Sequence, residues 1–154
     1  MNDDLRDLYQ EVILDHGRHP RNLRHPDKAN RTARGDNPLC GDKVVVYLEV
    51  GADGIIRDAA FEGRGCAIST ASASLMTETL RGKTEDEARA LFHAMHDMCT
   101  GQESPAEAAA DPDDLDRLRV LSGVRNFPMR VKCATLPWQA VLAALAGESK
   151  TTTE

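Results

Sequence analysis

The chain has 154 residues, enough for one domain whose core needs no disulfide staples. Its formal net charge of −6 argues against a general nucleic-acid-binding protein, because such proteins present clustered basic surfaces. The acidic start and the lack of an uncharged run long enough for a bilayer predict a cytoplasmic protein without a membrane segment. In that compartment cysteines are more often metal ligands or catalytic groups than disulfides, so the four cysteines are the main chemical candidates.

The first half of the chain predicts one helix followed by a small sheet. Apolar residues recur at helical spacing over residues 3–16, and Gly17 and Pro20 end this helix. An irregular basic loop is expected over 18–28. Strands are expected at 29–36, 43–50 and 55–62. The glycine-containing tetrapeptide between the last two strands is a hairpin signal, so the sheet is expected to be antiparallel with about three strands.

The second half predicts several helices that pack on one side of this sheet. The expected helices cover residues 67–82, 84–100, 113–121 and 135–146. Thr84 and Glu87 have the spacing of a capping box, and Thr135 with Pro137 resembles an N-cap and first turn. The prediction is therefore a single α+β domain over residues 1–154. It should be ordered at about 3–147, with a disordered tail at 148–154.

The most informative segment is the turn sequence Asn37-Pro38-Leu39-Cys40-Gly41-Asp42, which ends where a strand begins. Asparagine, proline and glycine are turn formers. A rigid turn of this kind can aim the Cys40 sulfur and the Asp42 carboxylate at one point. The pair suits either half of a zinc site or an activated thiol, and the turn alone leaves both open.

Two further cysteines are expected at helix N-termini. Cys66 follows Gly63 and Gly65 at the start of a helix, where free backbone N–H groups and the helix dipole favour a thiolate. Cys133 precedes the expected N-cap Thr135 by two residues, which is a similar position. The alternative for each cysteine is a small buried residue near a helix start.

Three thiols and one carboxylate make a donor set that suits tetrahedral zinc. The set consists of Cys40, Asp42, Cys66 and Cys133. With all four ligands ionised, the site would carry a net charge of −2, which Arg130 or Lys132 can offset. The spacing contains no C-x-x-C knuckle, so spacing alone leaves the zinc site open.

Two histidine clusters are weaker candidates. His93, His96 and Cys99 share one face of an expected helix. The favoured interpretation is two surface histidines beside a buried cysteine, because no carboxylate or turn converges on them. The second cluster lies in a loop that is too basic to favour a cation, and it contains His16, His19 and His25.

Three segments of the chain resemble the active-site segments of the IscU/NifU-like superfamily, in the same order. They are Asn37 to Asp42, Phe61 to Ser69, and Arg130 to Ala134. The resemblance runs from about Leu5 to Leu145 and implies a SufE/NifU-like α+β fold. It also implies a zinc site of Cys40, Asp42, Cys66 and Cys133, with Cys40 accepting sulfur and Arg130 functionally important.

Within the superfamily the chain is most similar to the SufU branch. Scaffold-type members carry a histidine directly before the last cysteine and a Leu-Pro-Pro-Val-Lys motif, whereas this chain has Lys132 and no such motif. The resemblance implies a zinc-dependent sulfurtransferase that acts as a persulfide relay. It would take sulfur from a SufS-type cysteine desulfurase, a pyridoxal-phosphate enzyme, and pass it to downstream iron–sulfur scaffold proteins.

Two alternatives remain. The same residues can bind iron or a [2Fe–2S] cluster, which would make the chain a non-enzymatic scaffold. Lys132 argues against this, because lysine is a poor cluster ligand. The other alternative is a structural zinc domain that only binds partners. Whether Asp42 holds or releases the metal during transfer is open.

Overall fold

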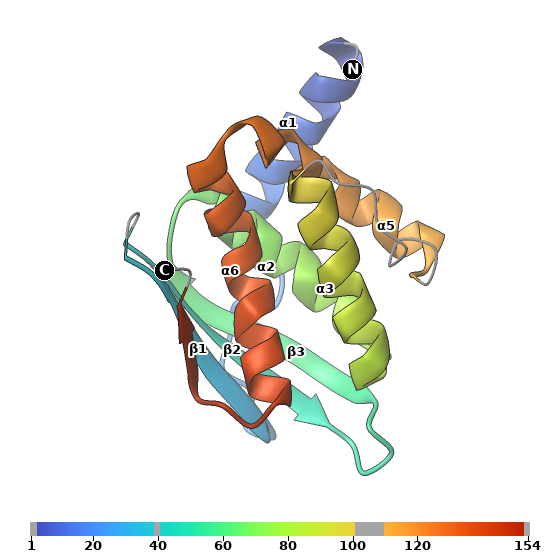
Figure 1. The fold of residues 1–154 in the computed structure, drawn as a ribbon. Coiled ribbons are helices and arrows are strands. Elements are labelled where there is room, and N and C mark those ends of the chain that lie inside the picture. Colours follow the sequence, from blue (N-terminus) through green and yellow to red (C-terminus); the bar gives the residue numbers. More distant parts are fainter. Residues whose placement is uncertain (1–2, 39–40, 101–109, 153–154) are drawn as a thin grey trace.

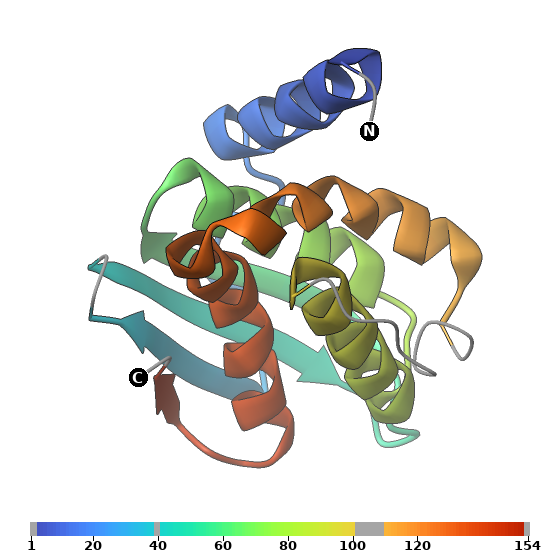
Figure 2. The ribbon, with the colours of Figure 1, turned by 45° about the horizontal axis from the view of Figure 1, so that its top comes forward.

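The computed structural model describes residues 3–38, 41–100 and 110–152 and has one sheet with helices on one side (Figure 1). The helices are α1 (Asp3–Arg18), α2 (Ala67–Leu80), α3 (Glu85–Thr100), α5 (Pro112–Leu118), the 3-10 helix η1 (Arg119–Asn126) and α6 (Pro128–Leu145). The strands are β1 (Arg31–Asn37), β2 (Asp42–Val50), β3 (Ile56–Arg64) and β4 (Lys150–Thr152). This arrangement confirms the predicted α+β class and the placement of the helices on one face (Figure 2).

The three expected strands form an antiparallel meander, and a fourth strand extends it. The strand order is β3-β2-β1-β4, with β4 parallel to β1. The expectation of a disordered tail is therefore wrong for Lys150–Thr152. After α6 the chain turns at Gly147, whose φ is +80°, and the Ser149 carbonyl accepts a hydrogen bond from the Arg34 amide at 2.9 Å. The short polar strand depends on the edge of β1, which the local sequence does not reveal.

The core lies between the sheet and the helices. Val44, Val46 and Leu48 alternate along β2 with more exposed residues, so their side chains point to the helical side. Leu136 of α6 packs on the sheet beside Gly35, and Trp138 of the same helix is also fully buried in the core. The core consists mostly of valine, leucine, methionine and alanine side chains.

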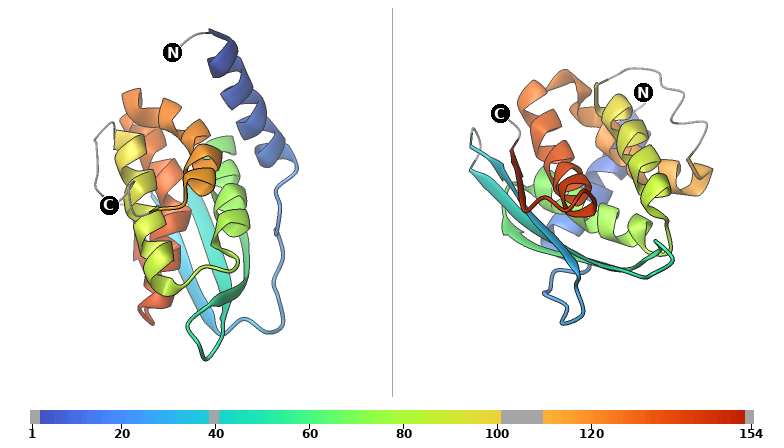
Figure 3. Two further views of the ribbon diagram at one scale, coloured as in Figure 1. Left: turned by 90° about the vertical axis from the view of Figure 1, so that its right-hand side faces the viewer. Right: turned by 60° about the horizontal axis from the view of Figure 1, so that its bottom comes forward.

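The loop after α1 runs along the sheet before entering β1 (Figure 3). It binds the edge of β3 through two backbone hydrogen bonds, from Arg24 N to Phe61 O and from Phe61 N to Asn22 O, each 3.0 Å long. His25 stacks on Tyr47 with 4.2 Å between ring centroids. The predicted irregular loop is thus ordered by contacts with the sheet.

The start of α6 is the main error in the predicted helices. The helix begins at Pro128, and Pro137 lies inside it. Thr135 does not cap the helix, because its Oγ1 donates to the Lys132 carbonyl at 3.4 Å within the helix. Judged from the sequence alone, either Pro128 or Pro137 could lie in the first turn of this helix. Pro137 has no N–H to donate, so the helix loses one backbone hydrogen bond there. Packing of the helix against the sheet and α2 makes this loss tolerable.

The capping box of α3 is confirmed. The Glu87 amide donates to Thr84 Oγ1, and the Thr84 amide donates to Glu87 Oε1, both at 3.1 Å. These reciprocal bonds satisfy two backbone N–H groups that the helix leaves unpaired. The start of α3 could be predicted because Thr84 and Glu87 are only three residues apart in the sequence.

A buried histidine fastens α1 to α2. His16 Nδ1 lies 2.7 Å from Ser74 Oγ, and the same hydroxyl accepts the Arg21 amide at 2.9 Å. Close by, Gly17 packs near the start of α2, where a Cβ on Gly17 would lie in ordinary contact with the Ala67 Cβ at 3.4 Å. Within the second histidine cluster, His16 therefore attaches α1 to α2, whereas His25 stacks on Tyr47.

Acid should weaken this attachment. Burial and Arg21 lower the pKa of His16, with Arg117 acting in the same direction and Glu78 and Asp15 opposing it. The unfolded chain therefore takes up this proton first, so stability should fall as the pH drops below about 6.5. We expect the urea midpoint of the wild type to decline between pH 7.5 and 5.5, and the decline to be smaller in His16→Gln. Equal declines in both proteins would contradict this assignment.

Candidate metal centre

Three residues from three different elements converge at one end of the sheet. Asp42 begins β2, Cys66 precedes α2, and Cys133 lies in α6 after its first turn. Figure 1 shows these element ends on the same side of the molecule. One ligand atom from each residue lies within 4.8 Å of the other two. Cys40, the fourth residue of the predicted set, lies outside the described residues.

Cys66 is the N-cap of α2. Its sulfur accepts a hydrogen bond from the Ser69 amide at 3.5 Å, so the thiol faces the free N–H groups of the first helical turn. This is the position that the sequence predicted. A negative sulfur is stabilised there by the helix dipole and by the backbone donor.

Asp42 links the start of β2 to the N-terminus of α2. Its Oδ1 accepts the Cys66 amide at 3.0 Å, and its Oδ2 lies 3.9 Å from the Cys66 sulfur. The residue is only 2% exposed. A buried carboxylate is unfavourable unless it is paired with positive charge, and the two sulfurs beside Asp42 supply further ligands for a cation.

Cys133 differs from its prediction. It lies inside α6 rather than before a helix, so no helix N-terminus stabilises its thiolate. Burial chiefly raises the pKa of Cys133, and the neighbouring Asp42 and Cys66 raise it further. The thiol is therefore neutral at physiological pH unless a cation joins the group.

Arg130 stands at the edge of the group. The thiols of Cys66 and then Cys133 raise the pKa of its guanidinium by charge and hydrogen bonding. The side chain is solvent-exposed. Arg130 and Cys133 are three residues apart in α6 and so lie on one helical face. Lys132, the other predicted cation, is half-buried on the same helix.

Glycines leave the space that this geometry needs. A Cβ on Gly65 would lie 2.9 Å from Asp42 Oδ1 and 3.1 Å from Ser69 Oγ. A Cβ on Gly63 would lie 2.2 Å from the Lys43 carbonyl oxygen, so β3 can approach β2 only with glycine here. The sequence signal for both positions was the glycine pair before Cys66.

Gly65→Ala should disturb the group directly. The added methyl displaces the Asp42 carboxylate from the Cys66 amide, which should lower stability by about 1–3 kcal/mol and weaken metal binding. The matched control is Gly123→Ala, because a Cβ at Gly123 meets no atom within 4 Å. Urea unfolding and zinc titration of both variants test this. A Gly65→Ala protein as stable and as tightly zinc-binding as Gly123→Ala would refute the crowding argument.

The other histidine and cysteine candidates stay apart. Cys99 is completely buried with its sulfur 3.5 Å from Met95 Sδ, and burial raises its pKa to about 12. His93 is exposed on the same helix. Within the described ranges, Asp42, Cys66 and Cys133 are the single group of three or more such ligands. The exposed His93 and the buried Cys99 agree with the predicted picture of surface histidines beside a buried cysteine.

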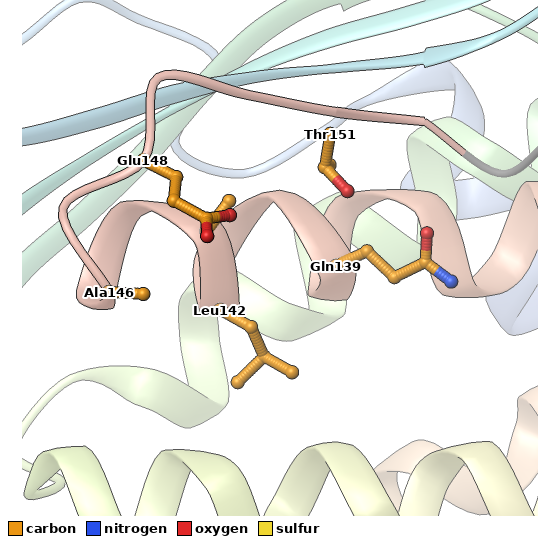
Figure 4. A pocket seen from close by; sticks show the side chains of 6 residues that line it. Gln139, Leu142, Ala146, Glu148 and Thr151 are labelled. Atoms are coloured by element: carbon orange, nitrogen blue, oxygen red, sulfur yellow. The ribbon is translucent and has the colours of Figure 1, made fainter.

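A cavity of about 310 Å³ lies elsewhere, between the end of α6 and β4 (Figure 4). It is lined by Gln139, Leu142, Ala143, Ala146, Glu148 and Thr151. None of the candidate ligands contributes to it, so the cavity is separate from the metal centre. The described part of the chain also contains no helix that is long and apolar enough to cross a membrane.

The donor group fits a zinc-like ion. A tetrahedral site with Zn–S bonds of about 2.3 Å places its ligands roughly 4 Å apart, close to the present spacing. Two sulfurs and a carboxylate match the preference of zinc, and Asp42 and Cys133 are buried while Cys66 is partly exposed. The same sulfurs also suit iron.

Comparison with known proteins agrees with this geometry. The family model of the NifU-like N terminal domain matches residues 8–134. The zinc-dependent sulfurtransferase SufU of Bacillus subtilis strain 168 is 40% identical over 147 residues, covering 96% of this chain and 95% of the relative. The scaffold protein IscU of Streptococcus pyogenes serotype M1 is 39% identical over 141 residues, covering 92% and 84%.

Solved structures show the same fold. The SufU protein of Fervidobacterium islandicum AW-1 aligns with a TM-score of 0.79 and 34% identity, over 94% of this chain and 99% of that chain. A NifU-like protein of Brucella abortus aligns with a TM-score of 0.79 and 27% identity, over 92% and 94%. The chain therefore belongs to the NifU-like N-terminal domain family, together with the SufU and IscU proteins that it resembles.

Proposed function

We propose that this protein is a zinc-dependent sulfurtransferase that relays persulfide sulfur for iron–sulfur cluster assembly. The observation that carries the proposal is the convergence of Asp42, Cys66 and Cys133, with Arg130 at the edge of the group. The 40% identity to a zinc-dependent sulfurtransferase supports the same choice. The sulfur acceptor in this proposal is Cys40, which precedes Asp42 by two residues.

The metal would be held by Asp42, Cys66, Cys133 and Cys40. Zinc bound there keeps cysteine ligands deprotonated at neutral pH. Deprotonation matters most for Cys133, because burial otherwise keeps its thiol neutral. The Cys66 amide bond to Asp42 Oδ1 leaves the second carboxylate oxygen toward the sulfurs, so Asp42 can bind a cation while staying attached to α2.

The transfer step conserves atoms and charge without an external oxidant. The Cys40 thiolate attacks the outer sulfur of a persulfide on a cysteine desulfurase. A new S–S bond forms on Cys40, the S–S bond of the desulfurase breaks, and its cysteine leaves as a thiolate. The outer sulfur carries its proton or charge to Cys40, so the protein ends with a persulfide.

Arg130 would stabilise the sulfur anion that moves during this step. Its guanidinium is exposed and lies beside the Cys66 and Cys133 sulfurs, so it can meet negative sulfur delivered from outside. The corresponding partner is a SufS-type, pyridoxal-phosphate-dependent cysteine desulfurase, and the acceptors are downstream iron–sulfur scaffold proteins. We place this exchange in the cytoplasm, where thiols stay reduced.

A scaffold function is the second candidate. The IscU relative at 39% identity is a cluster assembly scaffold, and two thiols with a carboxylate can also hold iron. A third possibility is a structural zinc domain that binds partners. These candidates differ in which metal copurifies and in whether Cys40 affects desulfurase turnover.

The deciding experiment compares wild type, Cys40→Ser and Cys99→Ser. Each is purified without added metal, its zinc and iron are measured, and each is added to a SufS-type desulfurase. We expect stoichiometric zinc and a higher turnover with wild type and Cys99→Ser, but no rise with Cys40→Ser. Iron-loaded, coloured protein without effect on turnover would replace the relay with the scaffold. If Cys40→Ser instead loses mainly folding stability, the structural zinc domain is correct.

A further inference from the structure

Asn37 is a buried amide at the end of β1. The core-facing positions of this strand are Ala33, Gly35 and Asn37, which alternate with more exposed residues. Asn37 is 1% exposed, and within the described part of the chain neither its Oδ1 nor its Nδ2 has a hydrogen-bond partner. Burial of an amide without partners is unfavourable, so such a group calls for a specific reason.

The turn does not supply that reason. Among the described residues, the side-chain oxygen of Asn37 accepts no hydrogen bond. The turn is closed by the main chain instead, since the Gly41 amide donates to the Asn37 carbonyl at 2.9 Å. The side-chain amide of Asn37 is therefore not what closes the turn.

The strand register places this amide beside the metal centre. Asn37 pairs directly with Asp42 across β1 and β2. Directly opposed residues project to the same face with their Cβ atoms about 4.5–5.5 Å apart. Both residues are buried on the helical side, where the Asp42 carboxylate meets Cys66 and Cys133. The amide and the carboxylate thus share one small buried space.

We propose that Asn37 is a positioning residue of the metal centre, whose side-chain N–H donates to the Asp42 carboxylate when that carboxylate binds the metal. The inference rests on the metal centre of the proposed function. A carboxylate offers about four acceptor sites. The Cys66 amide takes one, the metal takes another, and the Asn37 amide fills a third. Ligating carboxylates are regularly held by such outer hydrogen bonds, and loss of one commonly lowers metal affinity 10–100-fold.

The test compares Asn37→Ala and Asn37→Leu with Asn30→Ala. Asn30 lies just before the other end of β1, where its Nδ2 donates to the Val50 carbonyl at 2.8 Å and its Oδ1 accepts from the Val50 amide at 2.9 Å. Zinc affinity is measured by competition with a chromophoric chelator. Urea midpoints are measured with excess chelator, and the Co²⁺ visible spectrum reports the ligand geometry. Leucine keeps the branched shape of Asn37 and fills its space without the donor, which guards against a cavity in the alanine variant.

Both Asn37 variants should bind zinc at least tenfold more weakly, with a changed Co²⁺ spectrum. Their urea midpoints in chelator should equal or exceed the wild-type value, because an unpaired amide has been removed. Asn30→Ala should show the opposite pattern, with a lower midpoint and unchanged zinc affinity.

Wild-type zinc affinity and an unchanged Co²⁺ spectrum in both Asn37 variants would overturn the proposal. It would also be overturned if they lose zinc only in step with a lower midpoint in chelator. If the wild type itself fails to bind zinc stoichiometrically, the proposed metal centre fails with it, and the two failures are thereby distinguished.

Discussion

Cys133→Ser should lower zinc affinity about a hundredfold or more and leave a folded protein. A serine hydroxyl does not replace a thiolate as a zinc ligand, and structural zinc sites derive roughly 10–16 kcal/mol from all their ligands together. Loss of one ligand from the group of Asp42, Cys66 and Cys133 should therefore remove several kcal/mol of binding. Zinc content after gel filtration and chelator competition measure the effect.

Cys99→Ser is the matched control for this prediction. Cys99 and Cys133 are both 0% exposed, so each substitution buries a hydroxyl in place of a thiol, at about 1–3 kcal/mol of stability. Only Cys133 belongs to the metal group. Both variants should unfold at lower urea concentrations, but only Cys133→Ser should lose zinc. Retention of one tightly bound zinc by Cys133→Ser would show that this thiol is not a ligand.

Arg130→Ala should reduce sulfur transfer about ten- to a hundredfold while zinc content stays stoichiometric. The guanidinium supplies the positive charge beside the Cys66 and Cys133 sulfurs, and removal of one such stabilising group from a reaction site commonly has effects of this size or larger. Because the side chain is exposed, folding stability should change little. The measurements are desulfurase turnover, persulfide labelling on the protein and metal content.

Arg119→Ala controls for the loss of an exposed arginine near α6. Arg119 of η1 forms a surface contact with Asp116 at 3.8 Å, which contributes little. It should leave transfer, zinc content and stability essentially unchanged. Arg130→Lys should restore part of the transfer, since it keeps the charge but not the planar fork. Transfer by Arg130→Ala at the wild-type rate would exclude a role for this charge.

Local signals made much of the fold predictable. The Thr84–Glu87 capping box, the glycine hairpin before β3 and the amphipathic pattern of α1 each involve residues close in sequence. The predictions failed where contacts with residues distant in sequence determine the local structure. Lys150–Thr152 became a strand through the edge of β1, and α6 began at Pro128 because tertiary packing supports Pro137 inside it.

The candidate site was also predictable only in part. Glycine and turn residues marked Asp42 and Cys66, and the structure brings both to Cys133. The predicted position at a helix N-terminus is confirmed for Cys66, which caps α2, but is wrong for Cys133, which lies inside α6 and whose pKa is raised by burial. Asn37 was visible in the sequence as a turn former. Its buried amide became apparent only through its register opposite Asp42.

The sequence by itself therefore determined the chemical inventory of this protein and the local elements that carry it. Thiols, a carboxylate and a nearby arginine are properties of the chain, and turns and caps depend on neighbouring residues. The tertiary structure alone decided which of these groups meet and which are buried. Distances between residues far apart in sequence, and the desolvation that shifts the pKa of Cys133, exist only once α2 and α6 pack on the sheet.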